Sequence, residues 1–257
     1  KLFVQYARYA SPVPVGLLDR ATEAERVPVT GPSVIDPELE PLASHELVAG
    51  AAYTVGYKTQ VSATYTHRAL DSGLASLRTD SRGSVVLVNP GSGLGSALPR
   101  AERTYDAVTL EFFRDFNDGS TAHVSYTGSR LRGNQAGPWD ASTGSGPLPG
   151  DRPHVFRAWW QREFRLSNRF SFGSGLSYVG GSGTPRGASR TPWLHTVDAR
   201  LNLYWWLGKL ELADFSLDVF NLFNFQAATR LEARDSGLVP VRYPPPRQLR
   251  LGVRYRF

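Results

Sequence analysis

Apolar and polar residues alternate with a period of two over the last ten residues of the chain. Leu249, Leu251 and Val253 fall on one side of this pattern, and Arg250 and Arg254 fall on the other. Because successive side chains of a β-strand point to opposite faces, the alternation predicts a strand with one apolar and one charged face. In a soluble sandwich the apolar face would line a core, whereas in a membrane barrel it faces lipid and the polar face lines the lumen.

Segments of this kind recur along the whole chain. We predict ten strands, at residues 2–10, 46–56, 60–69, 103–115, 120–130, 154–165, 169–180, 195–206, 211–223 and 247–257. Lengths near ten residues suit tilted strands that cross a bilayer, and no run of about 18 apolar residues is present that could form a transmembrane helix. The pattern therefore predicts an all-β fold, an antiparallel transmembrane β-barrel segment.

The predicted connections alternate between short and long. The short ones lie around Gly56–Thr59, Asn117–Gly119, Leu166–Asn168 and Leu207–Leu210, and the long ones at 11–45, 70–102, 131–153, 181–194 and 224–246. The long ones hold most of the proline and loop glycine residues. This regular alternation is typical of barrels with short periplasmic turns and long extracellular loops.

The same periodicity predicts which way side chains point. We expect the lipid-facing set to include Leu201, Leu203, Leu217, Val219, Leu251 and Val253, and the lumen-facing set Arg200, Asn202, Asp218 and Arg254. Aromatic residues gather near strand ends, as expected for belts at the membrane–water boundary. Neighbours such as Trp205 and Trp206 point to opposite faces, so only one of each pair can join a belt.

Composition narrows the function classes. The chain has no Cys, which excludes a disulfide scaffold and a thiolate metal site, and no Met, so we expect either a removed leader or a longer parent chain. The net charge is +6, but the 29 Lys and Arg residues are scattered. Scattered charge favours a solvated barrel surface or lumen over a nucleic-acid site.

Motifs for catalysis or metal binding are missing from the sequence. The histidines, none at a metal-ligand spacing, are His45, His67, His123, His154 and His195. The Gly-Ser-Gly stretches at 91–96 and 144–146 lack the lysine of a phosphate loop, and no G-x-S-x-G elbow occurs. We therefore expect no enzyme activity, no metal and no cofactor.

Acidic residues leave one catalytic alternative open. Asp198, Asp218 and Glu111 are predicted to be lumen residues paired with Arg. Some small outer-membrane barrels are proteases with acidic and His residues at the extracellular rim. His154 with Asp151, or His195, could imitate that arrangement.

Four segments together resemble a known family. They are TYDAVTLEFFRDFNDGSTAHVSYTGSRLRGN at 104–134, DRPHVFR at 151–157, FSLDVFNLFN at 215–224 and RLGVRYRF at 250–257. In order and spacing they resemble the C-terminal part of TonB-dependent outer-membrane receptors. The likeness is to the subgroup that carries a carboxypeptidase-regulatory-like domain before the plug. Asn221 to Asn224 resemble the penultimate-strand signature of that family.

The resemblance implies a larger assembly. Members have a barrel of about 22 strands around a plug, which an inner-membrane TonB complex pulls using the proton gradient. We expect residues 1–257 to be the C-terminal barrel portion, with the plug, the remaining strands and the N-terminal domains supplied by the same or a separate chain. The implied function is movement of a substrate across the bacterial outer membrane, with lipid and lipopolysaccharide as surroundings. The loops expected to meet substrate are 70–102, 131–153 and 224–246.

The end of the chain resembles a second family feature. The barrel-assembly machinery reads a last strand that ends in an aromatic residue with apolar residues at every second position before it. The residues that fit are Leu249, Leu251, Val253, Tyr255 and Phe257.

Two alternatives stay open. The chain could be a complete ten-stranded barrel acting as an enzyme or adhesin, or a structural segment of a larger outer-membrane assembly. The partner of the first strand decides between them. If residues 2–10 pair with residues 247–257, the barrel is small and closed; otherwise both edges need strands from outside this sequence.

Overall fold

The computed structural model describes residues 1–11, 34–56, 58–78, 85–136, 144–186, 189–234 and 237–256. Ten long strands form one sheet in the order β1-β3-β4-β7-β8-β10-β11-β14-β15-β18. Their bounds are β1 Leu2–Ser11, β3 Leu42–Val55, β4 Thr59–Ser72, β7 Arg103–Asp115, β8 Ser120–Gly133, β10 His154–Arg165, β11 Phe170–Gly181, β14 Leu194–Leu207, β15 Leu210–Phe220 and β18 Gln248–Tyr255. Every neighbouring pair in this order is antiparallel.

The predicted strands are confirmed. The predictions for β7 and β10 match residue for residue, and the others differ by a few residues at their ends. The largest extension is at β3, which begins at Leu42 rather than at residue 46. No helix in the described ranges is long and apolar enough to cross a bilayer.

Glycine permits the tight backbone of three of the four short turns. Gly56, Gly119 and Gly208 each adopt a left-handed backbone, with φ of 63°, 80° and 63°. An L side chain resists this conformation, and glycine does not. In the turn between β7 and β8, Asp118 accepts hydrogen bonds from the Ser120 hydroxyl at 2.6 Å and the Ser120 N–H at 3.1 Å. These bonds stabilise its carboxylate and lower the pKa of Asp118.

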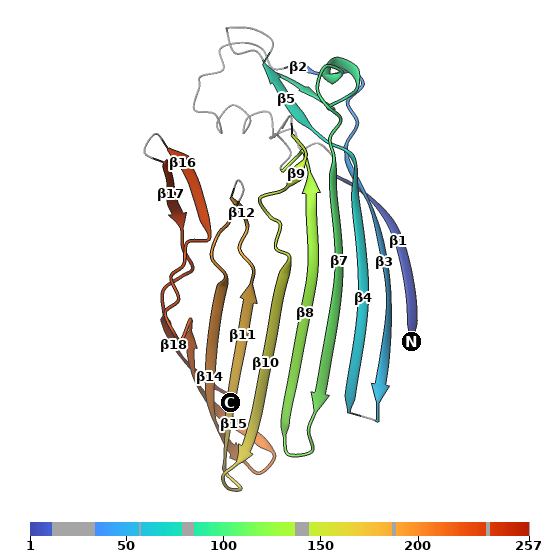
Figure 1. Ribbon diagram of the computed structural model, residues 1–257. Coiled ribbons are helices and arrows are strands. Elements are labelled where there is room, and N and C mark those ends of the chain that lie inside the picture. Colours follow the sequence, from blue (N-terminus) through green and yellow to red (C-terminus); the bar gives the residue numbers. More distant parts are fainter. Residues whose placement is uncertain are drawn as a thin grey trace.

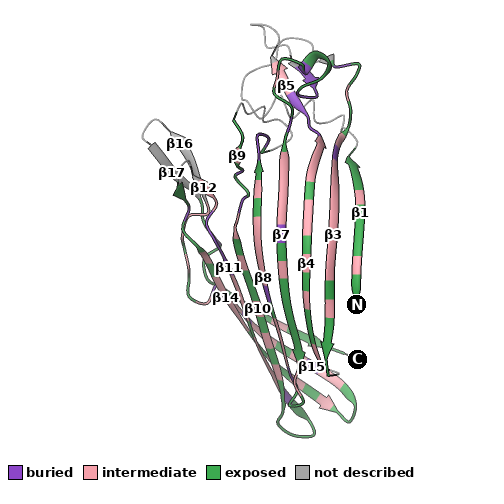
Figure 2. Ribbon diagram, turned by 45° about the vertical axis from the view of Figure 1, so that its right-hand side comes forward, coloured by how far each residue is buried: buried purple, intermediate pink, exposed green. Residues whose placement is uncertain are grey.

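The long strands lie side by side in a curved, open sheet, with the four short turns together at one end and the long connections at the other (Figures 1 and 2). The backbone N–H of Arg256 bonds to Leu212 O at 3.0 Å, which places the last described residue beside the turn that joins β14 to β15. Phe257 lies outside the described residues.

The two faces of the sheet separate by polarity. Leu201, Leu217 and Leu251 stand directly opposite one another on three adjacent strands. Arg200 and Asp218 occupy the next row, on the other face. We call the face of Leu251 the outer face and the face of Arg200 the inner wall. This segregation is the one predicted from the period of two.

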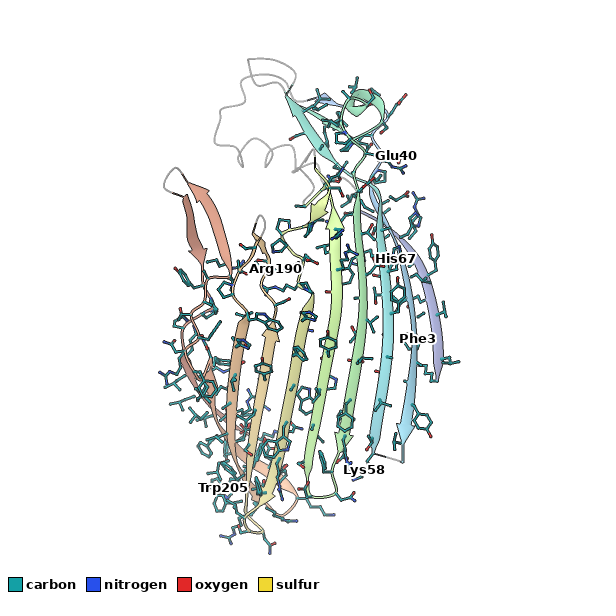
Figure 3. All side chains as sticks on the ribbon, in the orientation of Figure 1. Phe3, Glu40, Lys58, His67, Arg190 and Trp205 are labelled. Carbon is teal, nitrogen blue, oxygen red and sulfur yellow. The ribbon has the colours of Figure 1, made fainter. Side chains whose placement is uncertain are left out.

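Adjacent aromatic residues divide between the faces as predicted. Trp205 stacks on Phe170 on the outer face, with ring centroids 6.4 Å apart. Trp206 lies on the inner wall, where its Nε1 donates to the Ser171 hydroxyl at 2.9 Å. Figure 3 shows Trp205 near the short-turn end of the sheet.

The long connections contain structure that the sequence prediction missed. Their short elements are β2 Val34–Ile35, β5 Ala75–Arg78, β6 Val85–Val88, the 3-10 helix η1 Gly93–Gly95, β9 Gly146–Pro147, β12 Pro185–Arg186, β13 Ser189–Arg190, β16 Arg230–Arg234 and β17 Gly237–Arg242. The sheet β2-β6-β5 and the pairs β12-β13 and β16-β17 stand apart from the main sheet, whereas β9 pairs with β8.

The small sheet β2-β6-β5 has a core of its own. Ala75, Val86 and Val88 are buried together, and Leu77 and Leu98 pack against them. Burying these side chains removes apolar area from water, which stabilises the cap that they form. The described parts of the first two long connections therefore form a packed cap at the long-connection end (Figure 1).

The two edge strands do not close the sheet. Among the described residues β1 pairs only with β3, and β18 pairs only with β15. Closure between residues 2–10 and 247–257, which a complete ten-stranded barrel requires, is absent from this described sheet. The outward edges of both strands therefore offer backbone groups to strands outside it.

Arginine substitutions at two adjacent positions test the assignment of faces. Ala63 lies on the outer face between Ala51 and Leu110, and Thr64 lies on the inner wall between Gly50 and Thr109. Ala63→Arg should destabilise the intact protein by about 2–4 kcal/mol if the site is near the bilayer midplane, because the charge would then face hydrocarbon. Thr64→Arg should cost less than about 1 kcal/mol. Denaturant unfolding in lipid vesicles measures both, and equal costs would contradict the assignment.

Candidate functional site: the inner wall

An ion cluster on the inner wall crosses the last three strands of the sheet, β14, β15 and β18. Asp218 lies between Arg200 and Arg250 in the register. Its carboxylate accepts from Arg200 Nε at 2.5 Å and from Arg250 Nε at 2.9 Å and Nη2 at 2.7 Å. Asp218 is only 4% exposed, so its charge needs these partners. Two arginines against one aspartate give the cluster a net charge of +1, which makes this part of the wall attractive to anionic groups.

A groove runs beside this cluster because two wall positions lack side chains. Gly173 and Gly175 of β11 stand opposite Asn202 and Arg200 of β14. The hollow has a volume of about 180 Å³. Its lining consists of Gly119, Gln161, Arg162, Glu163, Gly173, Ser174, Gly175, Arg200, Asn202 and Tyr204. A lining of this kind can accept hydrogen-bonding groups from a plug or a solute.

Other acidic residues on the wall have partners that differ from the prediction. Glu111 was expected to pair with Arg. Its described contacts are instead the Ser62 hydroxyl, which donates at 3.0 Å, and His123 at 3.7 Å. Glu46 pairs with Arg68 one strand away. Among the described contacts of the three named acids, only those of Asp218 are the predicted Arg partners.

Asp198 was expected to pair with Arg, but its described contact is a hydrogen bond to the turn that follows β15. Its carboxylate accepts the backbone N–H of Asn221 at 2.7 Å. Asn221 is 5% exposed, and its side chain donates to Phe225 O at 3.0 Å and Pro245 O at 2.8 Å. The side-chain amide oxygen Oδ1 of Asn221 accepts the backbone N–H of Phe225 at 2.8 Å.

Left-handed backbone explains why this turn contains two asparagines. Asn221 and Asn224 have φ of 49° and 51°, a region that Asn tolerates better than most residues. The Asn224 side chain accepts the N–H of Arg247 at 2.9 Å, just before β18. The Asn-Leu-Phe-Asn motif therefore joins β14, β15 and the entry to β18. Sequence reasoning found the motif by resemblance, without this role.

Two of the three loops expected to meet substrate are joined to each other at their bases. Asn134 donates to Arg100 O at 2.8 Å and accepts the Glu102 N–H at 2.7 Å, which joins 131–153 to 70–102. Asp36 accepts the N–H of Leu94 at 2.8 Å and so joins the first long connection to the second. The tips at 79–84 and 137–143 lie outside the described residues.

The residues that could imitate a rim protease are not brought together. Asp151 is 2% exposed and pairs with Arg190 at 2.5 Å, and it also accepts the Leu131 N–H at 2.7 Å. His154 contacts Tyr126 and Trp193 instead. The Asp151–Arg190 ion pair thus joins the connection at 131–153 to the connection at 181–194. The described residues contain no group of three or more His, Asp or Glu side chains placed to hold a metal ion.

Substitution of Asn221 tests the structural role of the motif. Asn221→Ala should destabilise the intact receptor by about 3–5 kcal/mol, because it removes three buried hydrogen bonds and places a side chain in strained backbone. Asn221→Gly should cost about 1–2 kcal/mol less, since glycine relieves the backbone strain. Heat modifiability and urea unfolding in detergent report both variants. Equal losses for Gly and Ala would rule out a contribution from the left-handed backbone.

Comparisons with known proteins agree with this geometry. No family model matches the chain. The TonB-dependent transporter Oar of Myxococcus xanthus is 32% identical over 310 residues, covering 88% of this chain and 29% of the relative. The chain therefore spans less than a third of that relative.

Solved outer-membrane transporters share the fold. The outer-membrane transporter YddB of Escherichia coli matches with a TM-score of 0.71 at 13% identity, over 100% of this chain and 38% of the transporter. The FrpB iron transporter of Neisseria meningitidis matches at 0.66 and 18% identity, over 100% and 36%. The Escherichia coli import receptor Fiu matches at 0.55 and 16%, over 100% and 33%. The chain is a C-terminal barrel portion of the TonB-dependent receptor family of the bacterial outer membrane.

Proposed function

We propose that this chain forms the wall of a transporter that moves a substrate across the outer membrane with energy from the inner membrane. The observation that carries the proposal is the inner wall. Its ion cluster and glycine groove face a space that a membrane barrel encloses, while the outer face is apolar. A polar wall with a net-positive ion cluster suits a passage or a plug surface, and the similarity to a TonB-dependent transporter supports the proposed energy coupling.

The proposal extends to partners. A plug and about twelve further strands would complete the barrel, and TonB would act on the plug. The open edges of β1 and β18 support this, because an unpaired strand edge in hydrocarbon costs several kcal/mol for each exposed backbone group. The long connections at 70–102, 131–153 and 224–246 are proposed to meet the substrate first.

A comparison of growth media tests transport even though the substrate is unidentified. Solutes in spent medium are measured for cells with and without the intact receptor, each in the presence and absence of TonB. At least one solute should be depleted or accumulated only when both are present, since the plug does not move without TonB. Depletion indicates import and accumulation indicates export. Identical profiles in all four strains would support a purely structural segment instead.

The last strand is proposed to carry the assembly signal. Leu249, Leu251, Val253 and Tyr255 share the outer face of β18, and Phe257 continues their period in the sequence. Phe257→Ser should lower the amount of folded receptor in the outer membrane several-fold, whereas the neighbouring Arg256→Ser should leave it unchanged. Heat modifiability in membrane fractions measures the folded amount. An equal effect of the two substitutions would contradict a signal that is read at every second residue.

A further inference from the structure

A unit of Tyr and His recurs on the outer face. Tyr126 of β8 bonds to Nδ1 of His154 on β10 at 2.8 Å, and Tyr178 of β11 bonds to Nδ1 of His195 on β14 at 2.8 Å. In both units the histidine stands directly opposite a glycine two residues after the tyrosine, either Gly128 or Gly180. The rings of each unit stack, with centroids 6.1 and 6.2 Å apart.

The glycine is what lets the tyrosine reach its partner. A Cβ at Gly180 would lie 2.2 Å from the Tyr178 hydroxyl, and one at Gly128 would lie 3.3 Å from the Tyr126 hydroxyl. Each ring therefore lies over the glycine of its own strand. The same arrangement, a Tyr-x-Gly sequence with a histidine opposite the glycine on the next strand, thus occurs twice.

The same diagonal recurs on the first strands, where acids compensate the charge. Tyr6 bonds to His45, and His45 also contacts Asp71 at 3.3 Å. Tyr65 and His67 both bond to Asp106. These two units have their own counter-ions. His154 and His195 show no acidic partner among their described contacts.

Trp193 joins the two uncompensated units. Its ring stacks on His154 at 6.1 Å with an interplanar angle of 7°, and on His195 at 6.2 Å with an angle of 13°. Trp193 is 43% exposed. We call the set Tyr126, His154, Trp193, His195 and Tyr178 the ring ladder. It spans β8 to β14 as one surface of stacked rings.

The ladder lies at the depth of a membrane–water boundary. His154 is the first residue of β10 and His195 the second of β14, so both are at the long-connection end. His67 lies toward that same end in Figure 3, opposite the end that holds Trp205. Because aromatic belts mark the two boundaries of a barrel, the ladder borders the headgroups of one leaflet.

The hydrogen bonds to tyrosine also set what the histidines offer. When a tyrosine hydroxyl donates to Nδ1, the remaining proton of the neutral ring sits on Nε2. Nε2 is then a donor, and it stays a donor if the ring gains a second proton. With that tautomer the ladder presents Nε2–H donors and an exposed indole face, and its two histidines have no carboxylate among their described contacts.

We propose that the ring ladder binds the phosphorylated sugar headgroup of an outer-leaflet glycolipid. Phosphate oxygens accept hydrogen bonds from Nε2 of His154 and His195, and a sugar ring packs on Trp193. The hydrogen-bond donors, the exposed indole face and the depth of the ladder favour this occupant over a protein partner. The site depends on the outer-membrane location and not on the transport reaction.

Lipid retention by the intact receptor tests the site. Purified receptor is incubated with bisphosphorylated lipid A, exchanged into fresh detergent and examined by native mass spectrometry. The double variant His154→Asn/His195→Asn keeps an amide near the Nδ1 position but removes Nε2. It should retain roughly tenfold less lipid A than wild type, because two charge-assisted hydrogen bonds are lost. Dephosphorylated lipid A should bind wild type as weakly as lipid A binds the double variant.

Two matched variants complete the test. His123→Asn changes a histidine on the inner wall, beside Trp159, and should leave retention unchanged. Trp193→Ala should reduce retention of both lipid forms. Heat modifiability confirms that each variant is folded. Equal retention by wild type and the double variant, or no difference between the two lipid forms, would overturn the proposal and leave the ladder an ordinary aromatic belt.

Discussion

Backbone hydrogen bonding is the constraint on which this structure depends. Within hydrocarbon each unpaired N–H or C=O costs several kcal/mol, so only a closed sheet is stable there. Eight of the ten long strands have partners on both sides, whereas β1 and β18 have one each among the described residues. About five outward-pointing pairs on the ten-residue β1 and about four on the eight-residue β18 together amount to roughly tens of kcal/mol. A single-domain stability of about 5–15 kcal/mol cannot absorb that, which is the physical ground for the proposal that further strands close the barrel.

The alternation of side chains gives the one sheet two different surfaces, an apolar outer face and a polar inner wall. Rows such as Leu201, Leu217 and Leu251 meet lipid, and the adjacent row of Arg200, Asp218 and Arg250 faces inward. The charged row is stable because its members neutralise one another across strands. At the two ends of the strands the outer face changes to aromatic and histidine residues, where the surroundings change from hydrocarbon to headgroups. The apolar outer face and the charged inner wall are thus the arrangement expected of a barrel in this family.

The sequence predicted the strands well because a period of two is a strong signal over ten residues. It predicted the cap poorly: β6 is a four-residue apolar run, Val85–Val88, inside a segment dominated by glycine and serine. This apolar run was the only sequence signal for β6, and a run of four residues is too short to identify a strand. Register between strands was beyond the sequence pattern. For that reason the Tyr–His units and the partners of Glu111, which depend on which residues stand opposite, became visible only in three dimensions.

Cross-linking of the two edge strands tests the central claim most directly. The 257 residues contain no Cys, so introduced pairs here have no background. In the intact receptor, Leu217→Cys with Leu251→Cys places thiols on the directly opposed strands β15 and β18 and should cross-link with a short bis-maleimide. Val4→Cys with Leu251→Cys places them on β1 and β18 and should not, because further strands separate the two edges. Efficient cross-linking of Val4 to Leu251 would show a closed ten-stranded barrel and contradict the account.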